Sequence, residues 1–253
     1  MSYQIREWLN LAVRWAHVFA AIMWIGQTYF FTWLDHTLHQ EGNVWMVHSG
    51  GFYVVDKKAA GVLLPQKLHW FKWEAATTWI SGFLLMGLVY YGGGLMTRNE
   101  AALSIALLVT GWFVYDVLWL ALETREAAGV VISYILLVGA IFMMTRLFGS
   151  GRAAYMQIGA MLGTFMAANV WVRILPAQRK LIAAAQDGRE PVLRLAERAK
   201  QRSKQNTFMV LPVVFIMISN HFPVATYGNQ YNWIVLAALV LAGWGAAAIL
   251  RKR

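Results

Sequence analysis

The chain has 253 residues, of which 59% are hydrophobic, 14% aromatic and only 13% charged. This composition excludes a water-soluble globular domain and predicts an integral membrane protein. The absence of cysteine excludes disulfides, zinc-thiolate sites, iron-sulfur clusters and a covalently attached c-type haem on this chain, so a redox metal would be bound by histidine, methionine or carboxylates.

Seven apolar runs are long enough to cross a bilayer as helices, which takes about twenty residues each. They predict an all-α fold, a polytopic membrane bundle of about seven transmembrane helices that forms a single domain over residues 1–253. We expect Gly92, Gly93 and Gly94 to end the second run and Pro176 to end the fifth. The expected spans are Trp8–Leu34, His69–Tyr91, Ala101–Leu122, Ala127–Phe148, Arg152–Leu175, Asn206–Phe222 and Asn232–Leu250.

Two connections contain structure of their own. Asn43–Asp56 reads NVWMVHSGGFYVVD, two short apolar and aromatic runs around a Ser-Gly-Gly turn, which predicts a small β-hairpin that carries His48 against the inner face. Residues 177–205 have helical patterns on both sides of a break at Asp187–Pro191, which predicts a helical hairpin on the cytoplasmic surface. Adhesion to anionic membrane lipid is the simplest role for the basic residues of this second loop.

The distribution of Lys and Arg predicts the orientation, because short loops rich in these residues stay in the cytoplasm. Gln178–Lys204 holds eight of them, and alternating seven spans places fifteen on this side against four on the other. The N-terminus is therefore expected outside and the C-terminus in the cytoplasm. The net charge of +10 is explained by topology, and we expect no nucleic-acid partner. The other inside charges are Lys57, Lys58, Lys67, Arg125 and Arg251–Arg253, and the outside ones are Arg6, Arg98, Arg146 and Arg152.

Polar side chains inside the apolar runs are costly in a bilayer and mark either functional sites or contacts between helices. For Lys72 and Arg173, a helix-to-helix hydrogen bond or a snorkelling side chain explains the residue as well as a function does. Asp116 and Arg173 would also suit a transporter that uses an ion pair. The full set is His17, Asp116, Asn169, Arg173 and His221, with Lys72 and Glu74 close to a span end.

Two histidines lie near the outer ends of their runs. His17 follows Arg14 in RWAHVFAAIMWIG, and His221 follows Asn220 in LPVVFIMISNHFP. Because both are expected at one membrane depth, we predict that His17 and His221 bind the iron of one b-type haem. Arg14 would then pair with a propionate, and Asn220 would lie beside the site. The histidines expected on the inner side would make a second haem, a metal site or part of a substrate pocket, or else lie on the surface: His36, His39, His48 and His69.

Six motifs are distributed over nearly the whole chain: RWAHVFAAIMWIG, VWMVHSGGFY, HWFKWE, TTWISGFLLMGLVYY, ANVWVRILPAQRK and LPVVFIMISNHFP. Together they resemble the membrane domain of the bacterial urate hydroxylase family, the cytochrome-linked urate oxidases. Such proteins are similar in placing a soluble cytochrome c domain after the membrane domain, whereas this sequence stops at Arg253. The first run also resembles, more loosely, the opening helix of membrane protoporphyrinogen oxidases.

The resemblance implies oxidation of urate to 5-hydroxyisourate in the bacterial inner (plasma) membrane, with two electrons passing through haem to a separate c-type cytochrome. A b-type haem electron-transfer subunit, a membrane oxidase of another substrate and a non-redox transporter are the alternatives. Urate is a flat anion with imide and amide edges, so its pocket is expected to offer a positive charge, an amide and an aromatic face.

The inner ends of two spans carry side chains of these kinds. Asn169, Arg173 and Gln178 at the end of the fifth span, and Lys72 at the start of the second, are the expected substrate-binding residues. Loss of N–H protons from urate also needs a general base. His69 and Glu74, beside Lys72, are the expected catalytic residues.

Overall fold

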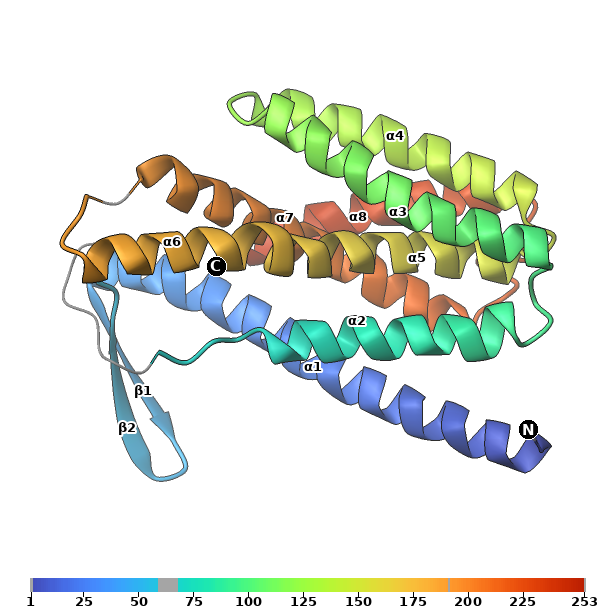
Figure 1. The fold of residues 1–253 in the computed structure, drawn as a ribbon, viewed down its shortest axis with the longest axis horizontal. Helices are drawn as coiled ribbons and strands as arrows, with labels where there is room; N and C mark the ends of the chain where they lie inside the picture. Colours follow the sequence, from blue (N-terminus) through green and yellow to red (C-terminus); the bar gives the residue numbers. More distant parts are fainter. Residues whose placement is uncertain (1, 59–67, 191, 253) are drawn as a thin grey trace.

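The computed structural model describes residues 2–58, 68–190 and 192–252 of the chain. Within these ranges, seven continuous helices lie roughly along one axis, and a β-hairpin projects from one end (Figure 1). This confirms the predicted helical bundle with a small hairpin. The elements are α1 (Tyr3–Glu41), β1 (Asn43–His48), β2 (Gly51–Asp56), α2 (Trp73–Leu85) with the π-helix η1 (Met86–Tyr91), α3 (Arg98–Ala121), α4 (Glu126–Leu147), α5 (Gly151–Ala168) with the π-helix η2 (Asn169–Ile174) and α6 (Leu175–Gln186), α7 (Leu193–Ser219) and α8 (Asn232–Leu250).

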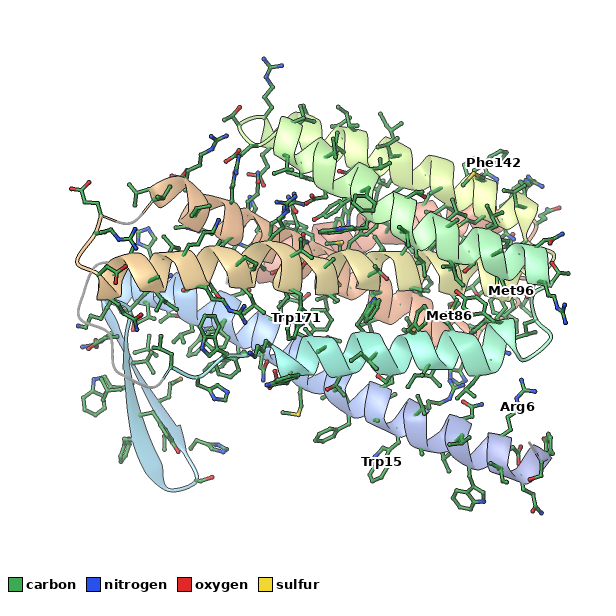
Figure 2. The ribbon with its side chains drawn as sticks, in the orientation of Figure 1. Arg6, Trp15, Met86, Met96, Phe142 and Trp171 are labelled. Carbon is green, nitrogen blue, oxygen red and sulfur yellow. The ribbon has the colours of Figure 1, made fainter. Side chains whose placement is uncertain are left out.

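Five of the described helices are long and apolar enough to cross a membrane: α1, α3, α4, the continuous rod α5–α6 and α8. Large apolar side chains also point away from the bundle, as Trp15 of α1 and Phe142 of α4 do in Figure 2. Outward apolar surface of this kind suits a lipid environment. That all seven helices cross a membrane stays a prediction.

The first helix is 39 residues long, which corresponds to about 58 Å at the α-helical rise. Ser2 caps its N-terminus by accepting a hydrogen bond from the backbone N–H of Ile5, and Gly42 ends it with a positive φ of 80°. The predicted span Trp8–Leu34 therefore lies within a longer helix. The second predicted span begins late, because Trp73 is the first helical residue and His69 precedes the helix.

The hairpin pairs Asn43 with Asp56 and His48 with Gly51. Its two-residue turn, Ser49 and Gly50, has positive φ at both positions, the backbone twist that tight hairpins need. Val44 packs with two buried leucines of α1, Leu34 and Leu38. Beyond this contact the hairpin extends away from the helices (Figure 1).

Two prolines lie within continuous helices, and one of them, Pro176, was expected to end a helix. The fifth predicted span does not end at Pro176, because the chain continues from α5 through η2 into α6. The wider π-turn makes this possible: Leu175 N–H bonds to the carbonyl of Val170, five residues back, and the missing N–H of Pro176 falls in the first turn of α6. Pro212 lies inside α7 and packs against Gly243 of α8, where a Cβ would be 2.9 Å from its ring.

The predicted helical hairpin of the basic segment is present, because α6 and the first part of α7 contact each other. Helices α6 and α7 form on both sides of the predicted break, but they are direct extensions of the rods that contain α5 and the apolar half of α7. Because α7 begins at Leu193, the sixth predicted span, Asn206–Phe222, covers only its second half. Pro191 of that break, with Lys67 and Arg253 of the expected inside charges, lies outside the described residues.

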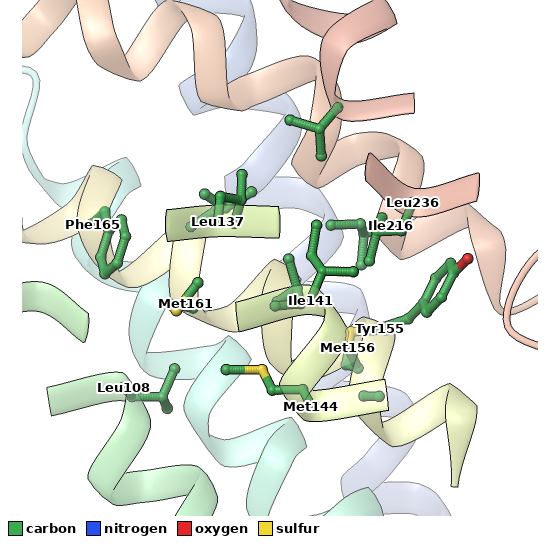
Figure 3. Close-up of a cluster of buried hydrophobic side chains, with 14 of the residues drawn as sticks. Leu108, Leu137, Ile141, Met144, Tyr155, Met156, Met161, Phe165, Ile216 and Leu236 are labelled. Atoms are coloured by element: carbon green, nitrogen blue, oxygen red, sulfur yellow. The ribbon is translucent and has the colours of Figure 1, made fainter. Parts of the chain in front are cut away.

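Helix α5 forms the centre of the bundle and contacts α2, α3, α4 and α7. Ala153, Ala154 and Ile158 are fully buried, and the close-up in Figure 3 shows Tyr155, Met156 and Met161 among side chains from the neighbouring helices. A Cβ at Gly159 would lie 2.8 Å from Ile216, so this glycine lets α7 approach closely.

The two ends of the bundle differ in charge. We call the end that carries the α6–α7 connection the basic end; the N-terminus lies at the opposite end, near the α2–α3 connection (Figure 1). Successive connections between helices lie at alternate ends of the bundle, as the sequence predicted for seven spans (Figure 1). Which end faces the cytoplasm stays a prediction.

Candidate functional site

Helices α1 and α2 pack antiparallel, and polar contacts along their interface link the two helices at three levels. Near the N-terminus, Arg6 Nη2 donates to the backbone carbonyls of Leu88 and Gly92, at 2.8 and 2.9 Å. The π-helix η1, whose hydrogen-bond pattern departs from that of an α-helix, contains one of these acceptors. We call the interface from this point to the start of α2 the α1–α2 seam.

His17 occupies the middle of the seam. Its Nδ1 lies 2.9 Å from the Thr78 carbonyl oxygen and 3.1 Å from Ser81 Oγ. A carbonyl only accepts, so the contact with Thr78 places the proton on Nδ1 and leaves the Nε2 lone pair available. Gly82 makes room for the ring, because a Cβ there would lie 3.0 Å from Cε1. Metal-binding histidines are oriented in this way by a hydrogen bond from the second nitrogen.

Two arginines lie toward the N-terminal side of His17. Arg14 is close enough to act electrostatically on the His17 ring and on the hydroxyl of Tyr90. Arg152 Nε donates to Asn220 Oδ1 at 2.8 Å, and its guanidinium lies 5.9 Å from the centre of the Tyr90 ring. In the described part of the chain, neither arginine has a carboxylate partner. The pair therefore leaves positive charge available for an anionic group.

His221 is exposed in the turn that follows α7, where its backbone N–H bonds to the carbonyl of Ile218. The neighbouring Asn220 reaches Tyr90, with 3.5 Å between Tyr90 OH and Asn220 Oδ1. Tyr90 lies nine residues beyond Ser81 on the same rod, about 13 Å at an α-helical rise. These contacts do not place His17 and His221 at the single level that the sequence suggested.

Glu74 occupies the far end of the seam, in the first turn of α2. Its Oε1 accepts a hydrogen bond from Gln27 Nε2 at 3.1 Å, and its buried Oε2 has no hydrogen-bond partner among the described residues. Lys72 Nζ lies 5.3 Å from the Trp73 ring centre and 5.9 Å from that of Trp171, and the two rings meet edge to face. We call these five residues the Glu74 cluster. The Gln27–Glu74 pair supplies an amide and a carboxylate, and the contacts among Lys72, Trp73 and Trp171 supply a cation and aromatic faces; the two sets are adjacent at the start of α2.

The structure separates the predicted substrate residues into two groups. Asn169 and Arg173 do not join Lys72 and Glu74, because they point from η2 toward α3 and α7. Arg173 Nε donates to Asp116 Oδ1 at 2.8 Å and makes a second, shorter contact with Oδ2. Asn169 Nδ2 donates to Tyr115 OH at 2.9 Å and to Asn206 Oδ1 at 2.8 Å.

The remaining candidates lie in neither group. Gln178 is exposed on α6, and His69 is exposed with its ring against Phe71, 4.6 Å between centres. His39 and His48 are exposed, and His36 is within 3.4 Å of the Gln40 side chain. The described residues contain no group of three or more histidine or acidic side chains that could hold a metal ion.

Several residues of these networks were not recognised from the sequence. Arg202, counted there as a topology charge, is only 3% exposed, and its Nη2 donates to Asp116 Oδ1 at 2.8 Å. The sequence did contain a signal for the burial of Arg202. The helical spacing of one buried face is followed by Arg202, Asn206, Met209 and Val210. Gln27, Tyr115 and Arg152 carried no comparable signal, because each stands alone in an apolar or irregular context.

Fold and seam together define an apolar helical-bundle protein in which one histidine, His17, is oriented by hydrogen bonds to its Nδ1. A family model described as urate oxidase N-terminal matches residues 3–252. The chain therefore belongs to the urate oxidase N-terminal family, and this membership indicates a urate-related oxidoreductase. No curated protein and no solved structure matches the chain.

Proposed function

We propose that the protein is a membrane-bound, haem-dependent urate oxidoreductase. In the proposed reaction, urate and water give 5-hydroxyisourate, two protons and two electrons. Family membership supports the substrate. The geometry supports the redox chemistry through one observation: Thr78, whose carbonyl orients His17, lies one helical turn from Glu74 on α2. The proposed histidine ligand and the proposed carboxylate base would thus lie along the same seam.

The residues around His17 fit a b-type haem. His17 would bind the iron through Nε2, and Arg14 and Arg152 would pair with the propionates, since both lack carboxylate partners among the described residues. His221, next to the Asn220 that Arg152 holds, stays the proposed second ligand, although its neighbour Asn220 contacts Tyr90, nine residues beyond the Ser81 that contacts His17; binding one iron would require His221 to approach the level of His17. When bound, the haem supplies a one-electron acceptor in an apolar surrounding.

The Glu74 cluster supplies the groups that urate needs. Lys72 offers a positive charge for the anion, and the rings of Trp73 and Trp171 offer a flat apolar face. Gln27 holds one carboxylate oxygen of Glu74, and the other is buried without a hydrogen-bond partner among the described residues, so it would take an N–H proton from the substrate once urate displaces the side chains that cover it. Removing that proton makes urate easier to oxidise and lets water add at the oxidised carbon.

The localisation and the electron acceptor complete the proposal. We place the protein in a bacterial inner membrane with its basic end in the cytoplasm, because Lys and Arg are concentrated in the loops of that end. Each haem stores one electron whereas urate releases two. A separate c-type cytochrome on the outer side is therefore proposed as the final acceptor.

Anaerobic mixing with urate tests the proposal. Urate should reduce the haem of the purified protein, measured at the Soret band, and Glu74→Gln should slow this reduction by about 10²-fold or more, the usual contribution of a general base. Glu197→Gln, a matched change at an exposed position of α7, should leave the rate unchanged. Unchanged reduction in Glu74→Gln with full haem content would remove Glu74 from the mechanism, and the absence of haem in wild type would refute the whole proposal.

The acceptor is tested with the same preparation. Without oxygen, urate should fill the haem and turnover should then stop, and oxidised soluble cytochrome c should restart it. Sustained aerobic turnover that yields one hydrogen peroxide per urate, with no cytochrome present, would instead identify oxygen as the acceptor.

A further inference from the structure

An apolar hollow of about 520 Å³ lies between α3 and α4, on the other side of the bundle from the α1–α2 seam (Figure 1). Side chains of α5, α7 and α8 form its floor, Met161, Phe165 and Met209 among them. Its rim includes exposed apolar side chains from both neighbouring helices, such as Val114 of α3 and Leu136 of α4. The hollow is therefore open to the medium that surrounds the bundle.

The hollow lies between two points at which α3 and α4 are tied together. Beside the α3–α4 turn, Trp119 Nε1 donates to Ser133 Oγ at 3.1 Å, and Gly129 leaves room for the indole, because a Cβ there would lie 3.0 Å from the ring. At the opposite end of the two helices, Glu100 Oε1 accepts a hydrogen bond from the backbone N–H of Gly149 at 2.7 Å. Between these ties α3 packs on α5, and α4 packs on α5 and α8. The packing of the helices thus holds the hollow open.

The hollow is long and apolar. On α3 its lining runs from Leu107 to Trp119, which is about 18 Å at the α-helical rise. One leaflet of a bilayer has a hydrocarbon layer of about 15 Å. The hydroxyls of Thr110 and Ser133 already have partners within the protein, and the unpaired amide nitrogen of Gln205 has no accessible surface, so it does not face the hollow. A slot of this length and polarity fits an acyl chain lying parallel to the helices.

The end of the hollow that is nearest the α3–α4 turn is positively charged. Lys204 and Glu126 line it and form an ion pair of 2.5 Å, in which both side chains are partly exposed. Arg125, the residue before Glu126, is exposed and has no acidic partner in the described part of the chain. These three side chains carry a net charge of +1. Because this end belongs to the basic end of the bundle, a phosphate here would meet complementary charge.

We propose that the hollow binds one acyl chain of an anionic phospholipid, whose phosphate lies against Arg125 and Lys204. The chain fills the slot between α3 and α4, and the headgroup lies at the basic end. This inference rests on the proposed membrane location, which supplies the lipid. It requires neither haem nor urate.

Native mass spectrometry of the purified full chain, with dioleoyl phosphatidylglycerol added in increasing amounts, tests the proposal. We expect one saturable site that binds phosphatidylglycerol at least fivefold more tightly than phosphatidylcholine with the same chains. Val114→Trp, which fills the slot from an exposed position of α3, should weaken binding of both lipids at least fivefold. Val117→Trp is the matched control: it is similarly exposed on the same helix but outside the hollow, and should bind as wild type does.

The headgroup contact is tested by a second pair of variants. Arg125→Gln should remove most of the preference for phosphatidylglycerol while binding of phosphatidylcholine stays unchanged. Arg179→Gln, at an exposed position of α6, should keep the preference.

Three results would overturn the proposal: no saturable site in wild type, equal affinity for the two lipids in wild type, or wild-type binding in Val114→Trp. The membrane location fails separately, if the chain is found in the soluble fraction of lysed cells. The haem and urate proposals are tested by the anaerobic reduction experiment, which does not depend on the lipid measurements.

Discussion

Removing the carboxylate of Asp116 should destabilise the bundle more than any single change at the surface. Asp116 is 7% exposed and accepts hydrogen bonds from Arg173 and from Arg202, whose side chain is only 4% exposed. In Asp116→Ala the buried Arg202 would lose its counter-charge, a loss that typically costs about 3–5 kcal/mol. For a domain of this size, that corresponds to a fall in melting temperature of roughly 6–20 °C.

Thermal unfolding of the purified variants in one detergent would measure this effect. The control is Asp187→Ala, which breaks an exposed ion pair with Arg189 and should cost no more than about 1 kcal/mol. Arg202→Met added to Asp116→Ala should recover at least half of the loss, because it removes the unpaired buried charge. A double variant no more stable than Asp116→Ala, or equal losses in Asp116→Ala and Asp187→Ala, would refute the reasoning. Full urate-dependent haem reduction in the folded double variant is expected, because this network points away from the seam.

Three further predictions concern topology, haem and pH. A reporter that fluoresces only in the cytoplasm should be bright when fused to the C-terminus; a dark fusion would reverse the orientation. His17→Ala should remove most of the haem or change its spectrum, as should His221→Ala if that residue is the second ligand; unchanged spectra in both variants would refute the assignment. Arg198 and Arg194 lower the pKa of Glu123 from 4.5 to about 2, so its stabilising effect is complete above about pH 5 and is lost as the pH falls toward 2. The difference in melting temperature between wild type and Glu123→Gln should accordingly shrink over that range, and a constant difference would contradict the ion-pair explanation.

Composition and local pattern determined the class and the elements of this protein. Seven long apolar runs have no alternative to helix if they are to satisfy their backbone hydrogen bonds in a bilayer, and each of them is helical over most of its length in the structure. The hairpin was predictable because the turn residues Ser49 and Gly50 separate two short apolar and aromatic runs, a local signal. His17 and Glu74 were recognisable as exceptions, since ionisable side chains are rare in apolar helices.

Only the tertiary structure decided which of the polar side chains in the apolar helices contact one another. Asn169, Arg173 and Lys72 all lie near one end of the bundle, yet the π-helix η2 turns the first two toward Asp116 and Tyr115 and leaves Trp171 for Lys72. An apolar helix has little contrast between its faces, so its sequence does not show which side contacts which neighbour. The burial of Arg202, the passage of the fifth rod through Pro176 and the unpaired amide of Gln205 likewise depend on how helices distant in sequence pack. Spacing along one chain does not determine such contacts, because they are set by packing between helices.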